Sequence, residues 1–166
     1  MTLTVYRVTP DDWRSHRDLR LEMLEDAPDA FFTQHADVAG FDEDAWRERI
    51  AVQCHFQVRR DRDPVGSVGI WEDPETPSDA STLVAMYVAP RARGTGVGER
   101  LVRAVLDEAV ARGRSRVVLE VTEGNDPAIR LYERMGFVFD GTRHPLPRKP
   151  DLEELGMERA LETPVP

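Results

Sequence analysis

The chain has 166 residues, a formal net charge of −9, a pI near 5.0 and a mean hydropathy of −0.49. The acidic balance argues against a general nucleic-acid binder, which needs a basic face. A hydrophobic fraction of 40% argues against a disordered chain. The one cysteine, Cys54, excludes an internal disulfide and a cysteine-based zinc cluster, and no apolar run approaches the roughly 18 residues of a membrane span.

The first residues, "MTLTVYRVTPDDW", have no basic start followed by an apolar block. No signal peptide is therefore expected, and a cytoplasmic location is the default expectation. The acidity mildly favours a cationic or amine-bearing substrate through long-range attraction, although it is equally consistent with a role in solubility alone.

Hydrophobic periodicity and capping residues predict eleven elements in the order β-α-α-β-β-β-α-β-α-β-β. Thr9, Asp42 and Asn125 are helix caps, and Gly113 ends the longest helix. The predicted strands are 3–8, 55–60, 64–71, 82–88, 116–121, 137–143 and 155–161, and the predicted helices are 10–25, 43–51, 96–112 and 125–135. A loop or broken helix is expected over 26–41, and loops over 72–81 and 144–151, with a loose tail at 163–166. The pattern indicates a single mixed α/β domain over 1–162 with a large sheet.

The stretch "RARGTGVG", residues 91–98, lies between a buried strand and the start of a helix. A helix N-terminus carries unsatisfied N–H groups and partial positive charge, and glycines let an anion approach them. Arg91 and Arg93 add charge suited to phosphate. A nucleotide P-loop would need Lys-Ser/Thr after its last glycine, and a dinucleotide fingerprint would need G-x-G-x-x-G, so both are disfavoured. A loop with a purely structural role is the alternative.

A second motif, "NDPAIRLYERMGF", runs from Asn125 to Phe137. Asn125 can cap the helix, with Pro127 just inside it. Tyr132 shares one apolar helix face with its neighbours, which is usually a core position with the hydroxyl at the rim.

The two stretches together resemble the Gcn5-related N-acetyltransferase (GNAT) family. Its Gln/Arg-x-x-Gly-x-Gly/Ala hallmark is matched by Arg91, Gly94 and Gly96. A second pattern of the family is matched at Asn125, Ala128, Leu131, Tyr132, Gly136 and Phe137. The resemblance implies an α/β fold with a mixed, mostly antiparallel central sheet of six to seven strands and helices on both faces. It also implies acetyl-CoA as co-substrate, with no metal, and a homodimer is common in such folds.

In this family acetyl-CoA binds in a V-shaped opening between two splayed strands. The resemblance implies that Met86, Tyr87 and Val88 pair their backbone with the pantetheine arm, as an added strand would. It further implies that the loop Arg91, Arg93, Gly94, Thr95, Gly96, Val97 and Gly98 wraps the pyrophosphate. Asn125 would face the pantetheine or thioester, and Tyr132 would lie near the sulfur.

The implied reaction is direct attack of a neutral amine on the thioester within a ternary complex, so it needs no protein nucleophile. Tyr132 is the expected acid, because a tyrosine hydroxyl can donate its proton to the departing thiolate. Glu120 is the expected base, by its spacing from Asn125, although a structural bond to a neighbouring strand or arginine is equally open. Glu22, Glu72 and His144 are weaker candidates for the base, Cys54 is expected in the core, and His16, His35 and His55 show no metal spacing.

The acceptor is expected to be a primary amine of a small molecule or peptide, with neither nucleic acid nor membrane as partner. Glu22, Glu25 and Asp26 could hold an amine cation or form a solvated face. Phe31, Phe32, Phe41 and Trp46 could line an acceptor pocket, or belong to the core or a dimer contact. A non-catalytic acyl-CoA sensor with the same fold is the alternative function, and a plain nucleotide-binding protein is weaker still.

Overall fold

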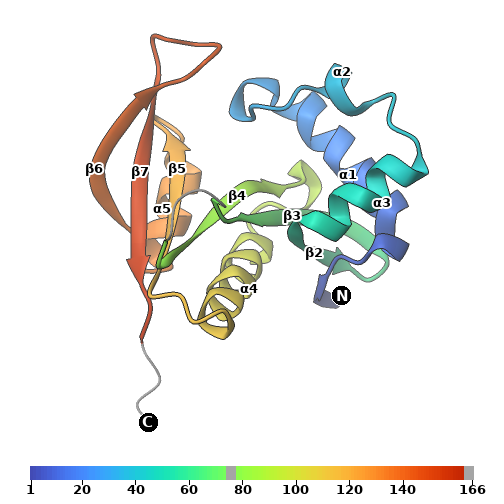
Figure 1. Cartoon of the computed structure of the whole chain (residues 1–166), viewed down its shortest axis with the longest axis horizontal. Coiled ribbons are helices and arrows are strands. Elements are labelled where there is room, and N and C mark those ends of the chain that lie inside the picture. Colours follow the sequence, from blue (N-terminus) through green and yellow to red (C-terminus); the bar gives the residue numbers. More distant parts are fainter. Residues whose placement is uncertain (74–77, 163–166) are drawn as a thin grey trace. The chain divides into compact units, whose positions relative to one another are not determined.

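The computed structural model describes residues 1–73 and 78–162, and the chain is coloured from its N-terminus to its C-terminus in Figure 1. The strands are β1 (Leu3–Arg7), β2 (Cys54–Arg60), β3 (Asp63–Trp71), β4 (Ala80–Val88), β5 (Arg116–Thr122), β6 (Val138–Pro145) and β7 (Glu153–Ala160). The α-helices are α1 (Trp13–Asp26), α2 (His35–Val38), α3 (Glu43–Val52), α4 (Val97–Ala111) and α5 (Asp126–Arg134). Short 3₁₀ turns are η1 (Pro10–Asp12), η2 (Pro28–Ala30) and η3 (Pro90–Ala92).

The strands form one mostly antiparallel seven-stranded sheet in the order β1-β2-β3-β4-β5-β7-β6. The parallel pair is β4 with β5, and its register covers Ala80–Thr82 against Arg116–Val118. The predicted fold class, with a mixed sheet of six to seven strands, is confirmed.

Contacts between residues divide the chain into two compact units. Unit 1 joins Met1–Gly69 with Ala85–Leu101, and unit 2 joins Ile70–Val84 with Val102–Pro166, within the described residues. The sequence nowhere marks this division, since it falls inside β3, β4 and α4.

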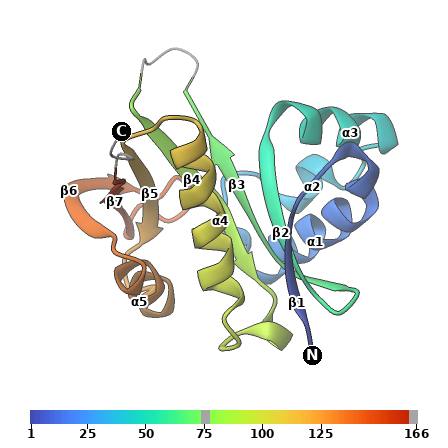
Figure 2. The same cartoon turned by 90° about the horizontal axis from the view of Figure 1, so that it is seen from below.

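Unit 1 has a core between α1, α3 and the end of β4. Figure 2 shows α1, α2 and α3 grouped beside β1 and β2. Its buried side chains are Leu19, Met23, Leu24, Val38, Trp46, Tyr87 and Ala89. The predicted cap of α3 is present, because Asp42 Oδ1 accepts a hydrogen bond from Ala45 N at 2.9 Å.

The start of α4 packs onto β3 at a glycine. A Cβ on Gly66 would lie 2.6 Å from Val97 Cγ1 and 3.0 Å from Leu101 Cδ1. Real Cβ atoms essentially never come this close, so only glycine lets the helix approach the strand here. Gly66 therefore allows the first turns of α4, which follow the glycine-rich loop, to pack closely on β3.

Unit 2 holds β5, β7 and β6 side by side, with α5 behind them in Figure 1. In the antiparallel register of β5 and β7, Leu119 pairs with Met157 and Val121 with Leu155. On the other face of the same strands Glu120 pairs with Gly156. Along β5 the burial alternates accordingly, since Leu119 and Val121 are buried and Glu120 is exposed.

Several predicted boundaries are wrong, and strand pairing explains most of them. β4 begins at Ala80 because Ala80 and Ser81 pair with β5. The predicted loop 144–151 is too long, since His144 and Pro145 continue β6 by pairing with Glu154 and Glu153 of β7. The first helix begins as η1, whereas the loop or broken helix predicted over 26–41 agrees with the two short helices η2 and α2 found there. The predicted loose tail at 163–166 and the middle of the loop over 72–81 lie outside the described residues.

Candidate functional site

The glycine-rich loop joins η3 to α4 in a conformation that requires glycine. Gly94 has φ +74° and Gly96 has φ +87°, both in the left-handed region. Among the described residues, no backbone carbonyl accepts a hydrogen bond from the N–H groups of Gly94 to Gly98, and Gly94 and Thr95 are exposed. The loop thus presents free donors at the positive end of a 15-residue helix, an arrangement suited to an anion.

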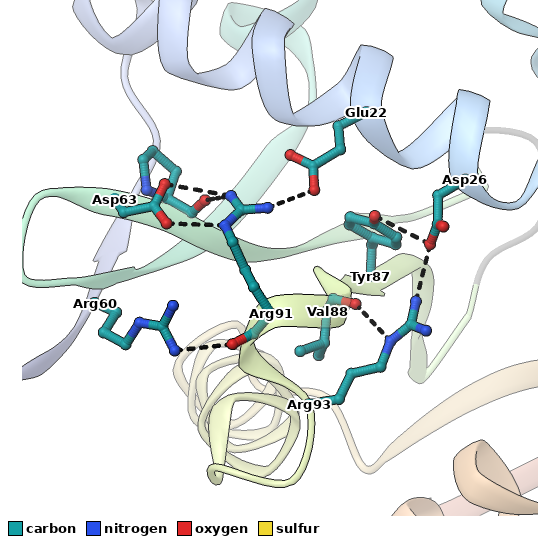
Figure 3. Close-up of polar contacts among 9 residues, drawn as sticks. Glu22, Asp26, Arg60, Asp63, Tyr87, Val88, Arg91 and Arg93 are labelled. Carbon is teal, nitrogen blue, oxygen red and sulfur yellow. Dashed lines mark hydrogen bonds and ion pairs between the residues drawn. The ribbon is translucent and has the colours of Figure 1, made fainter.

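Arg91, at the start of this loop, is held by two carboxylates (Figure 3). Its Nε donates to Asp63 Oδ2 at 2.9 Å and its Nη2 to Asp63 Oδ1 at 3.2 Å, which is a bidentate pair. Its Nη1 donates to Glu22 Oε1 at 2.6 Å, and Nη2 also donates to Pro64 O at 2.9 Å. The hydrogen bonds from Arg91 hold the pKa of Asp63 below its usual range.

Arg93 folds back over the end of β4 (Figure 3). Its Nε donates to Val88 O at 3.0 Å and its Nη2 to Asp26 Oδ2 at 2.9 Å. Asp26 is the last residue of α1, where a carboxylate opposes the helix dipole, so a cation beside it is favourable. The acids that the sequence left open as amine ligands, Glu22 and Asp26, are therefore paired with the arginines of the loop.

The segment Met86–Val88 follows a backbone irregularity. Ala85 has φ +52°, which is uncommon for a residue with a side chain. Tyr87 is buried against the core of unit 1, and its hydroxyl donates to Asp26 Oδ2 at 3.2 Å. Val88 O accepts from Arg93, so that carbonyl is already bonded within the chain.

In unit 2, Asn125 caps α5 as predicted, because its Oδ1 accepts from Ala128 N at 3.4 Å. Tyr132 lies on the buried face of this helix, with 5% of its surface exposed. Its ring packs edge-on against Phe137, with centroids 5.8 Å apart. Burial raises the pKa of the Tyr132 hydroxyl well above its usual value, so the group keeps its proton and can act as a donor.

Glu120 is half exposed on β5 and lies near two other titratable groups. Its Oε1 is 3.9 Å from His144 Nε2 of β6. Glu154 of β7 hydrogen-bonds to it; burial, and then this contact with Glu120, raises the pKa of Glu154 to about 7. Sequence analysis missed Glu154, since the predicted last strand began one residue after it.

The weaker sequence candidates have structural roles. Glu72 is bound by Arg114 and Ser81, and the hydrogen bond from Arg114 lowers its pKa to about 2, which makes it a poor base. Cys54 is the first residue of β2. In the described part of the chain no group of three metal-ligating side chains occurs, and no helix is long and apolar enough to cross a bilayer.

The aromatic residues considered for an acceptor pocket belong mostly to the core of unit 1. Trp46 is fully buried, and Phe41 packs against it with ring centroids 5.7 Å apart. Phe31 is partly buried against the same core. Phe32 is 82% exposed, so it alone of the four lies on the surface.

The sequence was compared with protein families and with known proteins. A sequence model of the acetyltransferase (GNAT) family matches residues 19–137. Streptothricin acetyltransferase of Streptomyces lavendulae is 48% identical over 60 residues, which are 36% of this chain and 32% of that protein. An uncharacterized N-acetyltransferase of Methanocaldococcus jannaschii is 28% identical over 151 residues, covering 82% of this chain and 61% of that protein. The chain thus spans less than two thirds of the length of these curated relatives.

Solved structures agree on the fold. An acetyltransferase of the GNAT family from Streptococcus pneumoniae has a TM-score of 0.81 at 19% identity, covering 97% of this chain and 100% of that one. A Salmonella typhimurium protein solved with its cofactor acetyl-CoA has a TM-score of 0.77 at 19% identity, covering 100% of this chain and 98% of that one. The fold is that of the acetyltransferases. The family match over most of the chain makes the assignment plain: the protein belongs to the acetyltransferase (GNAT) family.

Proposed function

We propose that this protein transfers an acetyl group from acetyl-CoA to a primary amine of a small molecule or peptide, and that residues 1–162 act as one acetyltransferase domain. The observation that carries the proposal is the loop from Gly94 to Gly98, whose N–H groups donate to no backbone carbonyl of the described residues. In a chain of this family, those donors suit the diphosphate of coenzyme A. The Salmonella typhimurium protein, which shares the fold, was solved with acetyl-CoA.

The residues divide into donor-binding and chemical roles. Backbone groups of Met86–Val88 are assigned to the pantetheine arm, except for the Val88 carbonyl, which Arg93 already occupies. The N–H groups of residues 94–98 are assigned to the diphosphate. Asn125 is assigned to the pantetheine or thioester region, beside its role as the cap of α5.

The reaction joins the amine nitrogen to the acetyl carbonyl carbon and breaks the carbon–sulfur bond. Glu120 is assigned as the base that takes the proton from the attacking amine, directly or through water. Tyr132 is assigned as the acid, since its raised pKa keeps the hydroxyl protonated until the thiolate leaves. The products are the amide and free CoA thiol, and direct attack requires no nucleophilic side chain.

The experiment has two parts. Calorimetry with CoA tests donor binding, and protein that binds no CoA would contradict the proposal. A free-thiol release assay over aminoglycosides, polyamines, amino acids and peptides then tests catalysis. Tight CoA binding without thiol release from any amine would favour the alternative, a non-catalytic acyl-CoA sensor.

A further inference from the structure

Arg91 is the most heavily bonded side chain of the donor loop. A guanidinium has five N–H groups. Arg91 makes four hydrogen bonds with them, to Asp63 Oδ1 and Oδ2, Glu22 Oε1 and Pro64 O. Its own carbonyl accepts from Arg60 Nη1 at 2.9 Å (Figure 3). Both its side chain and its backbone are therefore fixed to other parts of unit 1.

These bonds tie three segments together. Glu22 lies on α1, Asp63 begins β3, and Arg91 lies in η3 just before the glycines. Two carboxylates face one guanidinium, so the charge of Arg91 is more than balanced by its partners. To contact a phosphate, Arg91 would have to give up bonds to groups that also repel the phosphate.

We propose that Glu22 and Asp63 are positioning residues of the donor loop, which act through Arg91 to hold the Gly94–Gly98 backbone donors in place for the diphosphate. This inference rests on the proposed function, because it takes the loop to be the CoA site. In this proposal Arg91 supports the loop, and the backbone N–H groups bind the anion.

The partial exposure of these side chains allows a positioning role to be distinguished from a contribution to overall stability. The side chains of Arg91, Glu22 and Asp63 are 39%, 36% and 49% exposed. Ion pairs of such exposure add little to the free energy of unfolding. Their loss should therefore leave the protein folded while the loop loses its fixed position.

The sign of the effect distinguishes positioning from direct charge contact. If Arg91 contacted the phosphates, Asp63→Asn or Glu22→Gln would free its charge and remove repulsion, so CoA affinity would rise. If the carboxylates position the loop, the same isosteric substitutions lower CoA affinity. The two hypotheses thus predict opposite directions from one measurement.

The test is calorimetric CoA binding to the full chain and to Asp63→Asn, Glu22→Gln, Arg91→Ala and the double variant Asp63→Asn/Arg91→Ala. We expect each single variant to bind CoA about tenfold more weakly and the double variant no more weakly than Arg91→Ala. The KM for acetyl-CoA should rise by a similar factor with kcat unchanged. Exposed Glu25→Gln on α1 and Arg62→Ala beside β3 are matched controls and should bind CoA like the wild type.

Higher affinity in Asp63→Asn or Glu22→Gln, or additive losses in the double variant, would overturn the positioning role. Unchanged affinity in all the variants would overturn it as well. Wild-type protein that binds no CoA would instead overturn the proposed function itself. Circular dichroism and thermal unfolding of each variant confirm that the comparison is made between folded proteins.

Discussion

Glu154 of β7 hydrogen-bonds Glu120 of the neighbouring strand β5. The register makes them diagonal neighbours, because Glu120 pairs with Gly156 and Glu154 with Thr122. Burial and the neighbouring Glu120 carboxyl both favour the protonated form of Glu154, so its pKa is raised.

We expect the Glu154 carboxyl group to titrate near neutral pH, and we expect the substitution Glu154→Gln to abolish that titration. Burial and the contact with Glu120 raise the pKa of Glu154 to about 7, so the pair takes up a proton as the pH falls through that value. Glutamine fixes the neutral form and leaves Glu120 as the ionisable partner. Carbon-13 NMR of the glutamate carboxyl groups over pH 4 to 9 measures this directly.

The matched control is Glu158→Gln, on the same strand and face but paired with Arg116 at 3.1 Å. The titration near pH 7 should persist in that variant. If it also persists in Glu154→Gln, the titration near pH 7 belongs to another group.

Tyr132→Phe tests the proposed acid. Because Tyr132 is buried and its raised pKa keeps the hydroxyl protonated, the substitution removes one donor with little change in packing. We expect kcat to fall about a hundredfold or more, the usual contribution of general acid catalysis, with CoA affinity unchanged. Steady-state thiol release and calorimetry measure the two quantities separately.

Tyr6→Phe is the control for that experiment, since the Tyr6 hydroxyl donates to Gln57 in unit 1. It should leave kcat within about twofold of the wild type. Equal turnover in Tyr132→Phe and the wild type would remove Tyr132 from the chemistry.

Substitution of Gly94 or Gly96 by alanine tests the loop backbone. Both have positive φ, and a left-handed conformation costs a residue with a side chain about 1–2 kcal/mol. A Cβ meets nothing within 4 Å at Gly94, so the effect there comes from backbone strain alone. We expect weaker CoA binding and a lower free energy of unfolding by about that amount, measured by calorimetry and urea titration.

Gly40→Ala is the matched control, because a Cβ there also meets nothing within 4 Å and no positive φ is involved. It should leave both quantities near the wild-type values. Wild-type CoA affinity in Gly94→Ala and Gly96→Ala would show that the loop conformation is not needed for binding.

Features with local causes were predicted well from the sequence. Asp42 and Asn125 cap their helices by accepting hydrogen bonds from backbone N–H groups three residues away. Gly94 and Gly96 have positive φ angles, which favour glycine at those positions. Caps and turns depend on neighbours in the chain, so the sequence displays them directly. The family motifs are also short stretches of the chain, so they can be read directly from the sequence.

Features that depend on distant partners were missed. Arg91 meets Asp63 and Glu22 across 28 and 69 residues, and nothing in the chain between them signals these pairs. Glu154 meets Glu120 only through the register of β5 with β7. The same pairing extends β6 through Pro145, where proline is tolerated because β6 is the edge strand of the sheet.

The buried histidine pair in unit 1 predicts a loss of stability in acid. His16 and His55 are stacked edge to face with ring centroids 4.7 Å apart and are 3% and 4% exposed. Burial lowers the pKa of His16 to about 3 and that of His55 to about 4, both below the ordinary value of 6.5. Below pH 6.5 the unfolded chain therefore binds protons that the folded chain does not.

Stability should accordingly be complete above about pH 6.5 and fall as the pH drops toward the folded pKa values, by up to about 1.4 kcal/mol per pH unit for each histidine. Urea unfolding at pH 7.5, 6.0 and 5.0 measures this slope. The double variant His16→Leu/His55→Gln should have a flatter dependence, whereas His35→Gln, which lies on α2 outside the pair, should keep the wild-type slope. If the double variant loses stability in acid as steeply as the wild type, the proton uptake on unfolding comes from other groups.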